Sequence, residues 1–179
     1  MSSSTLSGFT ATVITISDSS SRGGRTDLSG PAVAELLKQK SFQVIARQIV
    51  PDDVKAIRRA LTGAARSTRL VVTTGGTGIA ERDVTPEATR TVCDRLLEGV
   101  AERIRAEGAK KTPFAALSRA ICGVRGESII LNLPGSPAGA VESLDAVIDI
   151  LPHALELLSG NTAHDAPPSK RRSPTLRVR

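Results

Sequence analysis

Aromatic side chains are nearly absent from this chain of 179 residues, which contains no Trp or Tyr and only 3 Phe. Proteins that bind single-stranded nucleic acids usually combine aromatic stacking platforms with a basic groove. The net charge of +6 does not supply such a groove in the body of the chain. Residues 161–179 hold five of the 24 basic and one of the 18 acidic residues, so 19 basic and 17 acidic residues remain for residues 1–160. The sequence therefore predicts no nucleic-acid partner.

Cysteine and histidine are scarce as well, with two residues of each. Cys93 and Cys122 have neither the spacing of metal ligands nor a disulfide framework around them, and we expect both to be buried thiols. His153 and His164 lie near the end of the chain, far from its glycine-rich segments. The sequence therefore supports neither a Cys/His metal cluster nor a hydrolytic triad with a histidine base.

Long apolar runs are also missing. No run approaches the roughly 18–20 residues that span a membrane. The first residues, MSSSTLSGFTATVITIS, contain no basic residue ahead of their apolar part, so no secretory signal is predicted. We therefore expect a cytoplasmic protein without a membrane partner.

Segments typical of strands and helices alternate through residues 1–160. The apolar runs of residues 10–17 and 70–74 predict buried strands of a parallel sheet, and residues 42–50 predict a further strand. Helices are predicted over residues 32–40, 54–67, 85–92, 93–107 and 137–159, the last one broken at Pro152. The segment around Arg125 and Gly126 predicts a small hairpin. This pattern predicts an α/β fold with a single doubly wound, mostly parallel sheet and helices on both faces.

The remaining residues, 161–179, are rich in Pro, Ser and Arg. Such a composition lacks the apolar pattern of a core, so we expect a disordered basic tail. The predicted organisation is one domain over residues 1–160 followed by this tail.

Polar or glycine-rich clusters follow each predicted parallel strand and the hairpin. These clusters are Ser17-Asp18, Asp52-Asp53, TTGGTG (73–78) and NLPGSP (132–137). Ligands of open α/β sheets bind beyond the carboxyl ends of the strands, so we expect the clusters to meet at one edge. The glycines can direct N–H groups at an anion, and the second loop leads into a helix N-terminus, which is also an anion site. Taken alone, however, GGTG is also compatible with a tight turn and PGSP with a capped helix start.

Two carboxylates stand beside these loops. Asp83 lies between the glycine loop and the predicted N-cap Thr85, and Asp52 follows the second strand. Asp52 is also compatible with a helix N-cap, and Asp83 with a hydrogen-bond acceptor inside the loop. Two carboxylates near bound phosphates are what a Mg²⁺-dependent nucleotide reaction would use.

Four stretches of the chain resemble the molybdopterin adenylyltransferase family, which includes the G domain of gephyrin and of plant molybdenum-insertion proteins. They are TISDSSSRGG with DLSG, VVTTGGTGIAERDVTPEAT, LSRAICGVRG and LNLPGSPAGAVE, spread over residues 10–160. The resemblance implies a molybdopterin-binding-like fold and a homotrimer. It also implies transfer of AMP from Mg-ATP to the terminal phosphate of molybdopterin, with release of pyrophosphate. A downstream molybdenum-insertion enzyme would then be a partner.

The resemblance also implies roles for individual residues. Asp52 and Asp83 match the family's essential aspartates, and we expect them to be catalytic and to hold Mg²⁺. The residues expected to bind molybdopterin or the nucleotide are Ser17, Asp18, Asp27, Ser29, Gly30, Thr74, Gly75, Gly76, Thr77, Gly78, Ser118, Arg119, Pro134, Gly135, Ser136 and Pro137. Within this set, the glycine loop would cradle phosphates, the PGSP loop would lie on the nucleotide side, and Ser118 and Arg119 would bind the substrate phosphate.

An alternative function is a non-catalytic molybdopterin-binding or scaffolding module, with the basic tail as a partner contact. Such a module would not need both Asp52 and Asp83, which favours the enzyme. A relative that binds molybdopterin but adenylylates it poorly would keep the same motifs, so this alternative also stays open.

Overall fold

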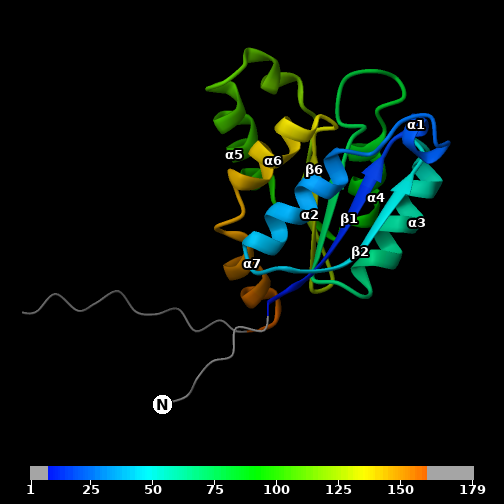
Figure 1. The fold of residues 1–179 in the computed structure, drawn as a ribbon. Coiled ribbons are helices and arrows are strands. Elements are labelled where there is room, and N and C mark those ends of the chain that lie inside the picture. The colour runs from blue at the N-terminus through cyan, green and yellow to red at the C-terminus, as the bar shows by residue number, and fades with distance from the viewer. Residues whose placement is uncertain (1–7, 161–179) are drawn as a thin grey trace, which may run out of the picture.

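The structure, a computed structural model, describes residues 8–160 (Figure 1). Its centre is a six-stranded sheet with the strand order β2-β1-β3-β6-β5-β4. The strands are β1 (Thr10–Ile16), β2 (Gln43–Val50), β3 (Leu70–Thr74), β4 (Arg95–Leu96), β5 (Cys122–Arg125) and β6 (Ser128–Leu133). β2, β1, β3 and β6 are parallel, whereas β5 is antiparallel to both β6 and β4. The predicted tail, residues 161–179, lies outside the described residues.

Helices cover both faces of this sheet. They are α1 (Asp18–Ser21), α2 (Ser29–Gln39), α3 (Val54–Ala65), α4 (Thr85–Val92), α5 (Glu98–Ala109), the 3-10 helix η1 (Pro113–Leu117), α6 (Pro137–Asp145) and α7 (Leu151–Leu158). α2, α5, α6 and α7 pack on one face and α3 and α4 on the other. The predicted doubly wound α/β fold is therefore confirmed.

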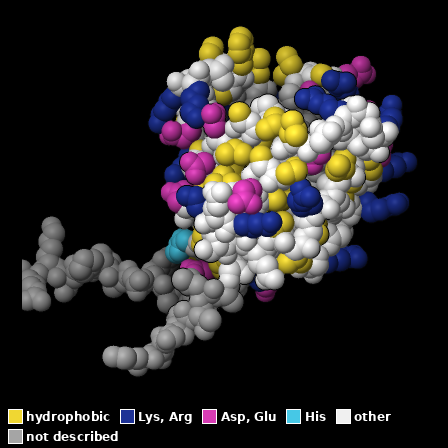
Figure 2. Space-filling view, viewed as in Figure 1, with side chains coloured by type: hydrophobic (Ala, Val, Ile, Leu, Met, Phe, Trp, Pro, Cys, Tyr) yellow, Lys and Arg dark blue, Asp and Glu magenta, His cyan; other side chains and the backbone are white. Residues whose placement is uncertain are grey.

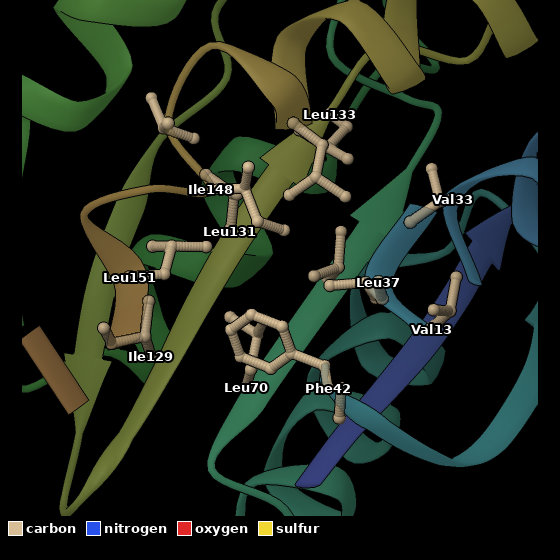
Figure 3. Packing of buried hydrophobic residues seen from close by; sticks show 14 of the residues in the cluster. Val13, Val33, Leu37, Phe42, Leu70, Ile129, Leu131, Leu133, Ile148 and Leu151 are labelled. Atoms are coloured by element: carbon tan, nitrogen blue, oxygen red, sulfur yellow. The ribbon is translucent and has the colours of Figure 1, made fainter. Parts of the chain in front are cut away.

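The alternation of side chains along the parallel strands builds two cores. Val13 of β1 faces the larger cluster, while its neighbour Ile14 faces the smaller cluster under α3 and α4. Figure 3 shows the larger cluster, in which Leu37 of α2 and Leu131 of β6 point into the same layer. Every residue of β3 is buried, as expected for a central parallel strand.

The structure corrects three element boundaries. The predicted helix 93–107 begins only at Glu98, because Asp94 and Leu97 donate backbone hydrogen bonds to Val124 and Cys122 and so add β4 to the sheet. The expected loop 18–30 contains the short helix α1, and α2 begins at Ser29. The last predicted helix is divided into α6 and α7, with Pro152 in the first turn of α7 as a break signal would require.

The cysteine prediction is confirmed for one of the two thiols. Cys122 is buried, whereas Cys93 is half-buried. Burial raises the pKa of Cys93 to about 11 and that of Cys122 to about 12.

Over the described part of the chain, no helix combines the length and the apolar character needed to cross a membrane.

Candidate functional site

Two hollows open at the carboxyl ends of the parallel strands, at the upper edge of the sheet in Figure 1. The first hollow has a volume of about 600 Å³ and the second about 650 Å³. They share Gly135 and Ser136, so they lie side by side. The structure therefore confirms that the polar clusters after the strands lie together at one edge of the sheet.

The predicted site residues divide between these hollows. Those lining the first hollow are Ser17, Asp18, Asp27, Ser29, Asp52, Thr74, Gly75, Gly76, Asp83, Gly135, Ser136 and Pro137. Those lining the second hollow are Thr77, Gly78, Ser118, Pro134, Gly135 and Ser136. Gly30 and Arg119 line neither hollow, and their contacts give them supporting roles.

Asp18 and Asp52 join the ends of β1 and β2 by two reciprocal hydrogen bonds. The Asp18 N–H donates to Asp52 Oδ2 at 2.8 Å, and the Asp52 N–H donates to Asp18 Oδ1 at 3.1 Å. Asp52 is not the N-cap of α3, because Asp53 fills that position and accepts from the Ala56 N–H at 2.8 Å. The carboxylate of Asp52 is thereby held at the mouth of the first hollow.

This position makes the ionised form of Asp52 less favourable than it is in water. Burial raises the pKa of Asp52 above its ordinary value, and the nearby charges of Asp18 and Asp83 raise it further. The hydrogen bond from Asp18 and the charge of Arg82 oppose this shift without cancelling it. Two further carboxylates, those of Asp18 and Asp83, therefore lie close enough to Asp52 to act on its charge.

Asp83 closes the far end of the glycine loop. Its Oδ2 accepts from the Ala80 N–H at 3.1 Å, and a Cβ added to Gly78 would lie 2.8 Å from the same oxygen. Glycine at position 78 therefore allows this carboxylate to lie against the loop backbone. The contact agrees with the loop-acceptor interpretation, and Asp83 also lines the first hollow.

The glycine loop needs its glycines for both conformation and space. Gly75 and Gly76 have φ values of 102° and 62°, which L side chains rarely adopt. A Cβ on Gly75 would lie 2.3 Å from the carbonyl oxygen of Ile16, and a Cβ on Gly135 would lie 3.3 Å from the Cα of Gly75. The two predicted phosphate loops therefore pack directly against each other.

Thr85 was predicted as the N-cap of the helix after the loop, and this detail is wrong. The N-cap is Val84, and Thr85 is already helical and fully buried. Its hydroxyl instead donates to the Gly75 carbonyl at 3.0 Å, so it holds the glycine loop rather than the helix end. Pro86 still occupies the first turn, as predicted.

Asp27 precedes α2, and its side chain accepts a hydrogen bond from Gly30 in the first turn of that helix. Asp27 accepts from the Thr15 hydroxyl at 2.8 Å and from the Gly30 N–H at 3.0 Å. A Cβ on Gly30 would lie 2.4 Å from Asp27 Oδ2, so only glycine fits beneath this carboxylate. Asp27 lines the first hollow, but its hydrogen bonds hold the first turn of α2. Gly30 donates one of these bonds and leaves space for the carboxylate.

Arg119 holds the glycine loop from outside. Its backbone N–H donates to Thr77 O at 2.9 Å, and its Nε donates to Gly78 O at 2.7 Å. Its terminal nitrogens donate to the Asp83 carbonyl and to the carboxylate of Glu87 on α4. With these donors engaged, Arg119 is better placed to position the loop than to bind the substrate phosphate that we had expected it to bind.

The sequence prediction did not include some residues that the structure places in or beside the candidate site. Arg22, Arg25 and Arg82 line the first hollow and bring positive charge to it. Their signal was the cluster SRGGR after the first strand and the position of Arg82 next to Asp83. Asn132 is fully buried and donates to Thr73 and Thr89, which links β6, β3 and α4 beneath the glycine loop.

The carboxylates alone do not make a closed metal site. Within residues 8–160, His, Cys, Asp and Glu nowhere gather in a group of three that could hold a metal ion. Mg²⁺ often binds through one or two carboxylates together with substrate phosphates and water. The pair Asp52 and Asp83 therefore fits a cation that is bound jointly with a phosphate-containing ligand.

The raised pKa of Asp52 predicts a stability change that depends on pH. Because ionised Asp52 is disfavoured in the folded state, its charge costs stability at neutral pH, and this cost disappears as the pH falls through its pKa. Asp52→Asn should therefore melt at a higher temperature than the wild type at pH 7.5, without added metal. The difference in Tm should shrink toward pH 4, where Asp52 becomes protonated and is then neutral, as Asn is at every pH. A lower Tm for the variant at pH 7.5 would contradict this prediction.

Comparison with known proteins agrees with this geometry. Residues 12–153 match the family model described as "Probable molybdopterin binding domain". The molybdopterin adenylyltransferase of Helicobacter pylori J99 is 41% identical over 153 residues, which cover 83% of this chain and 87% of that protein. Gephyrin of Dictyostelium discoideum is 34% identical over 89% of this chain and 24% of that protein. The solved structure of the molybdopterin biosynthesis enzyme MoaB from Thermus thermophilus is 49% identical, with a TM-score of 0.80 over 85% of this chain and 97% of that one. The chain belongs to the molybdopterin-binding domain family.

Proposed function

We propose that this protein is a molybdopterin adenylyltransferase of molybdenum cofactor biosynthesis. It transfers AMP from ATP to the terminal phosphate of molybdopterin and releases pyrophosphate. The observation that carries the proposal is the first hollow, where Asp52 and Asp83 lie beside the glycine loop and the N-terminus of α6. The relatives named molybdopterin adenylyltransferase support it.

In the proposed reaction, an oxygen of the molybdopterin phosphate attacks the α-phosphorus of ATP. The bond between that phosphorus and the oxygen bridging to the β-phosphate breaks, and the electron pair leaves with pyrophosphate. The nucleophile is already an anion, so no protein base has to remove a proton. The residues of the first hollow therefore act by positioning and by stabilising charge.

The groups around the first hollow are suited to this task. The N-terminus of α6 and the backbone N–H groups that follow Gly75 in the glycine loop favour phosphate oxygens. Arg22, Arg25 and Arg82 add positive charge on the lining. The second hollow has exposed Phe114 and Leu117 on its wall, which suit the flat ring of a substrate. Because the hollows adjoin at Gly135 and Ser136, two substrates can lie next to each other.

Mg²⁺ is the cation that we propose for this site. Asp18, Asp52 and Asp83 all line the first hollow, and carboxylate oxygens are ligands that Mg²⁺ prefers. Asp52 and Asp83 would hold it, and Asp18 would orient Asp52 through their reciprocal hydrogen bonds. When bound, Mg²⁺ would neutralise charge on the phosphates of ATP.

The test is direct transfer of label. The full-length protein is incubated with molybdopterin, Mg²⁺ and ATP labelled at the α-phosphate, and the label is followed into a pterin product. We expect transfer with the wild type and with Asp53→Asn, because Asn caps a helix as well as Asp does. Binding of molybdopterin without transfer of label would instead support the non-catalytic module.

Substitution of Arg119 tests its proposed positioning role. Arg119→Ala should lower kcat/KM about 10- to 100-fold, because small displacements at a reacting centre have effects of this size. It should raise the KM for both ATP and molybdopterin, since the loop it holds borders both hollows. Arg90→Ala, on exposed α4 surface, serves as the control. A rise in the KM for molybdopterin alone would favour direct phosphate binding by Arg119.

We further propose a homotrimer that works in the cytoplasm and delivers its product to a downstream molybdenum-insertion enzyme. The described surface carries exposed apolar side chains that subunit contacts can cover, among them Ile45 and Ile49 on β2. Light scattering after size-exclusion chromatography should give three times the 18.7 kDa of one chain. The mass of a monomer would refute the trimer and leave the proposed reaction untouched.

A further inference from the structure

A third hollow lies beside α3, away from the candidate site, and all of its charged side chains are basic. Its volume is about 540 Å³, and it shares no lining residue with the first or the second hollow. This basic hollow is lined by Lys55, Arg58, Arg59, Thr62, Gly63, Arg66, Thr91, Val92 and Arg125. In Figure 2, dark-blue side chains project from the edge of the molecule where α3 lies in Figure 1.

None of the five cations that line the basic hollow has an ion-pair partner within residues 8–160. Arg125 donates a hydrogen bond to the Val92 carbonyl at 2.7 Å. The residues outside 8–160 include a single acidic residue, Asp165. Like charges on one helix face repel each other, so the cluster lowers the stability of the isolated chain. An anionic partner would remove this repulsion.

The spacing of the cations along α3 indicates an elongated ligand. Arg59 lies one helical turn after Lys55 and Arg66 two turns after Arg59, with Arg58 and Thr62 between them on the same side. The stripe from position 55 to position 66 is about 16 Å long at the rise of an α-helix. That length exceeds a single phosphate or carboxylate and matches a segment of several residues. Arginine guanidinium groups bind carboxylates through paired hydrogen bonds.

We propose that the basic hollow is a docking surface for an acidic segment of a partner protein. A nucleic acid fits less well, because no aromatic side chain lines the hollow and the charges of residues 1–160 nearly balance. The surface is separate from the first and second hollows, so a docked partner leaves the candidate site open. The proposal does not depend on the adenylyl-transfer reaction.

Two charge-matched variants of the full-length protein test this proposal. The hollow variant combines Arg58→Gln, Arg59→Gln and Arg66→Gln. The control variant combines Lys38→Gln, Arg47→Gln and Arg95→Gln, which are exposed cations outside all three hollows and outside the ion pairs found in residues 8–160. Both variants lose the same charge, and the 161–179 segment is present in both. Binding of a fluorescein-labelled 12-residue Glu/Ala peptide is measured by fluorescence anisotropy at 50 mM and 150 mM salt.

The hollow variant should bind the peptide at least tenfold more weakly than the wild type, and the control variant within about twofold of it. Equal weakening in both variants would overturn the proposal, because binding would then follow net charge alone. Absence of peptide binding by the wild type at 50 mM salt would also overturn it. Tighter binding of a labelled 12-nucleotide single-stranded DNA than of the peptide would overturn the choice of an acidic protein. A Tm of the hollow variant equal to or above that of the wild type, as the loss of like-charge repulsion predicts, excludes unfolding as the cause of lost binding.

Discussion

Asp83→Asn is expected to lower the rate of AMP transfer at least about 100-fold, the size of effect seen when one charge-stabilising group is removed from a preorganised site. The asparagine oxygen can still accept from the Ala80 N–H, so the loop conformation should survive. The substitution therefore removes one of the four carboxylate charges that line the first hollow and changes little else. Molybdopterin binding and Tm should stay close to those of the wild type.

Single-turnover label transfer, together with equilibrium binding of molybdopterin, measures the two effects separately. Asp53→Asn is the matched control, because Asp53 is a helix N-cap one position from Asp52 and should tolerate Asn without loss of rate. Transfer at the wild-type rate by Asp83→Asn would remove Asp83 from the catalytic machinery. If Asp83→Asn lost both molybdopterin binding and AMP transfer, the role of Asp83 would be in substrate binding.

Gly75→Ala should cause a large loss of stability. At a φ of 102° any L side chain is strained, and the new Cβ would lie 2.3 Å from a backbone oxygen of the neighbouring strand β1. Strain and overpacking together predict a loss of about 3 kcal/mol in the free energy of unfolding. For a chain of this size, that corresponds to a decrease in Tm of about 6–12 °C.

Gly63→Ala is the control for the chemistry of the substitution. Gly63 lies within α3, and no atom lies within 4 Å of a Cβ added there. Alanine in a helix should increase stability by about 0.5–1 kcal/mol. Thermal unfolding of both variants by circular dichroism distinguishes the two sites. A Tm for Gly75→Ala within about 2 °C of the wild type, well below the expected shift, would show that the loop relaxes and that its left-handed glycine is dispensable.

The two residues also differ in their expected effect on catalysis. Gly75 packs against Gly135 and donates its N–H to Leu133 O at 3.1 Å, so a shift at position 75 moves both phosphate loops. Folded Gly75→Ala protein should therefore transfer AMP more slowly even at temperatures well below its Tm. Gly63→Ala should leave the rate unchanged, since Gly63 lies outside both hollows of the candidate site.

The amino-acid sequence by itself determined the fold class and the edge of the sheet that carries the site. The apolar runs 10–17 and 70–74 predict buried parallel strands, the run 42–50 predicts a further strand, and polar or glycine residues follow each of the three. Because parallel strands end at a common edge, the clusters at Asp18, Asp52 and Gly75 had to meet there. These signals lie within a few neighbouring residues, which is why they can be read without the structure.

Only the tertiary structure decided which side chains face the ligand and which support those that do. The partners of Asp52 and Asn132 lie 34 residues and up to 59 residues away in the chain. Arg119 reaches the loop residue Gly78 across 41 positions, and β4 forms because two residues pair with β5. Such contacts depend on how the sheet and its helices pack, and local propensity contains no information about them. The sequence therefore determined which residues gather at the site. The packing of the sheet and its helices determined which of them face the ligand and which hold the others in place.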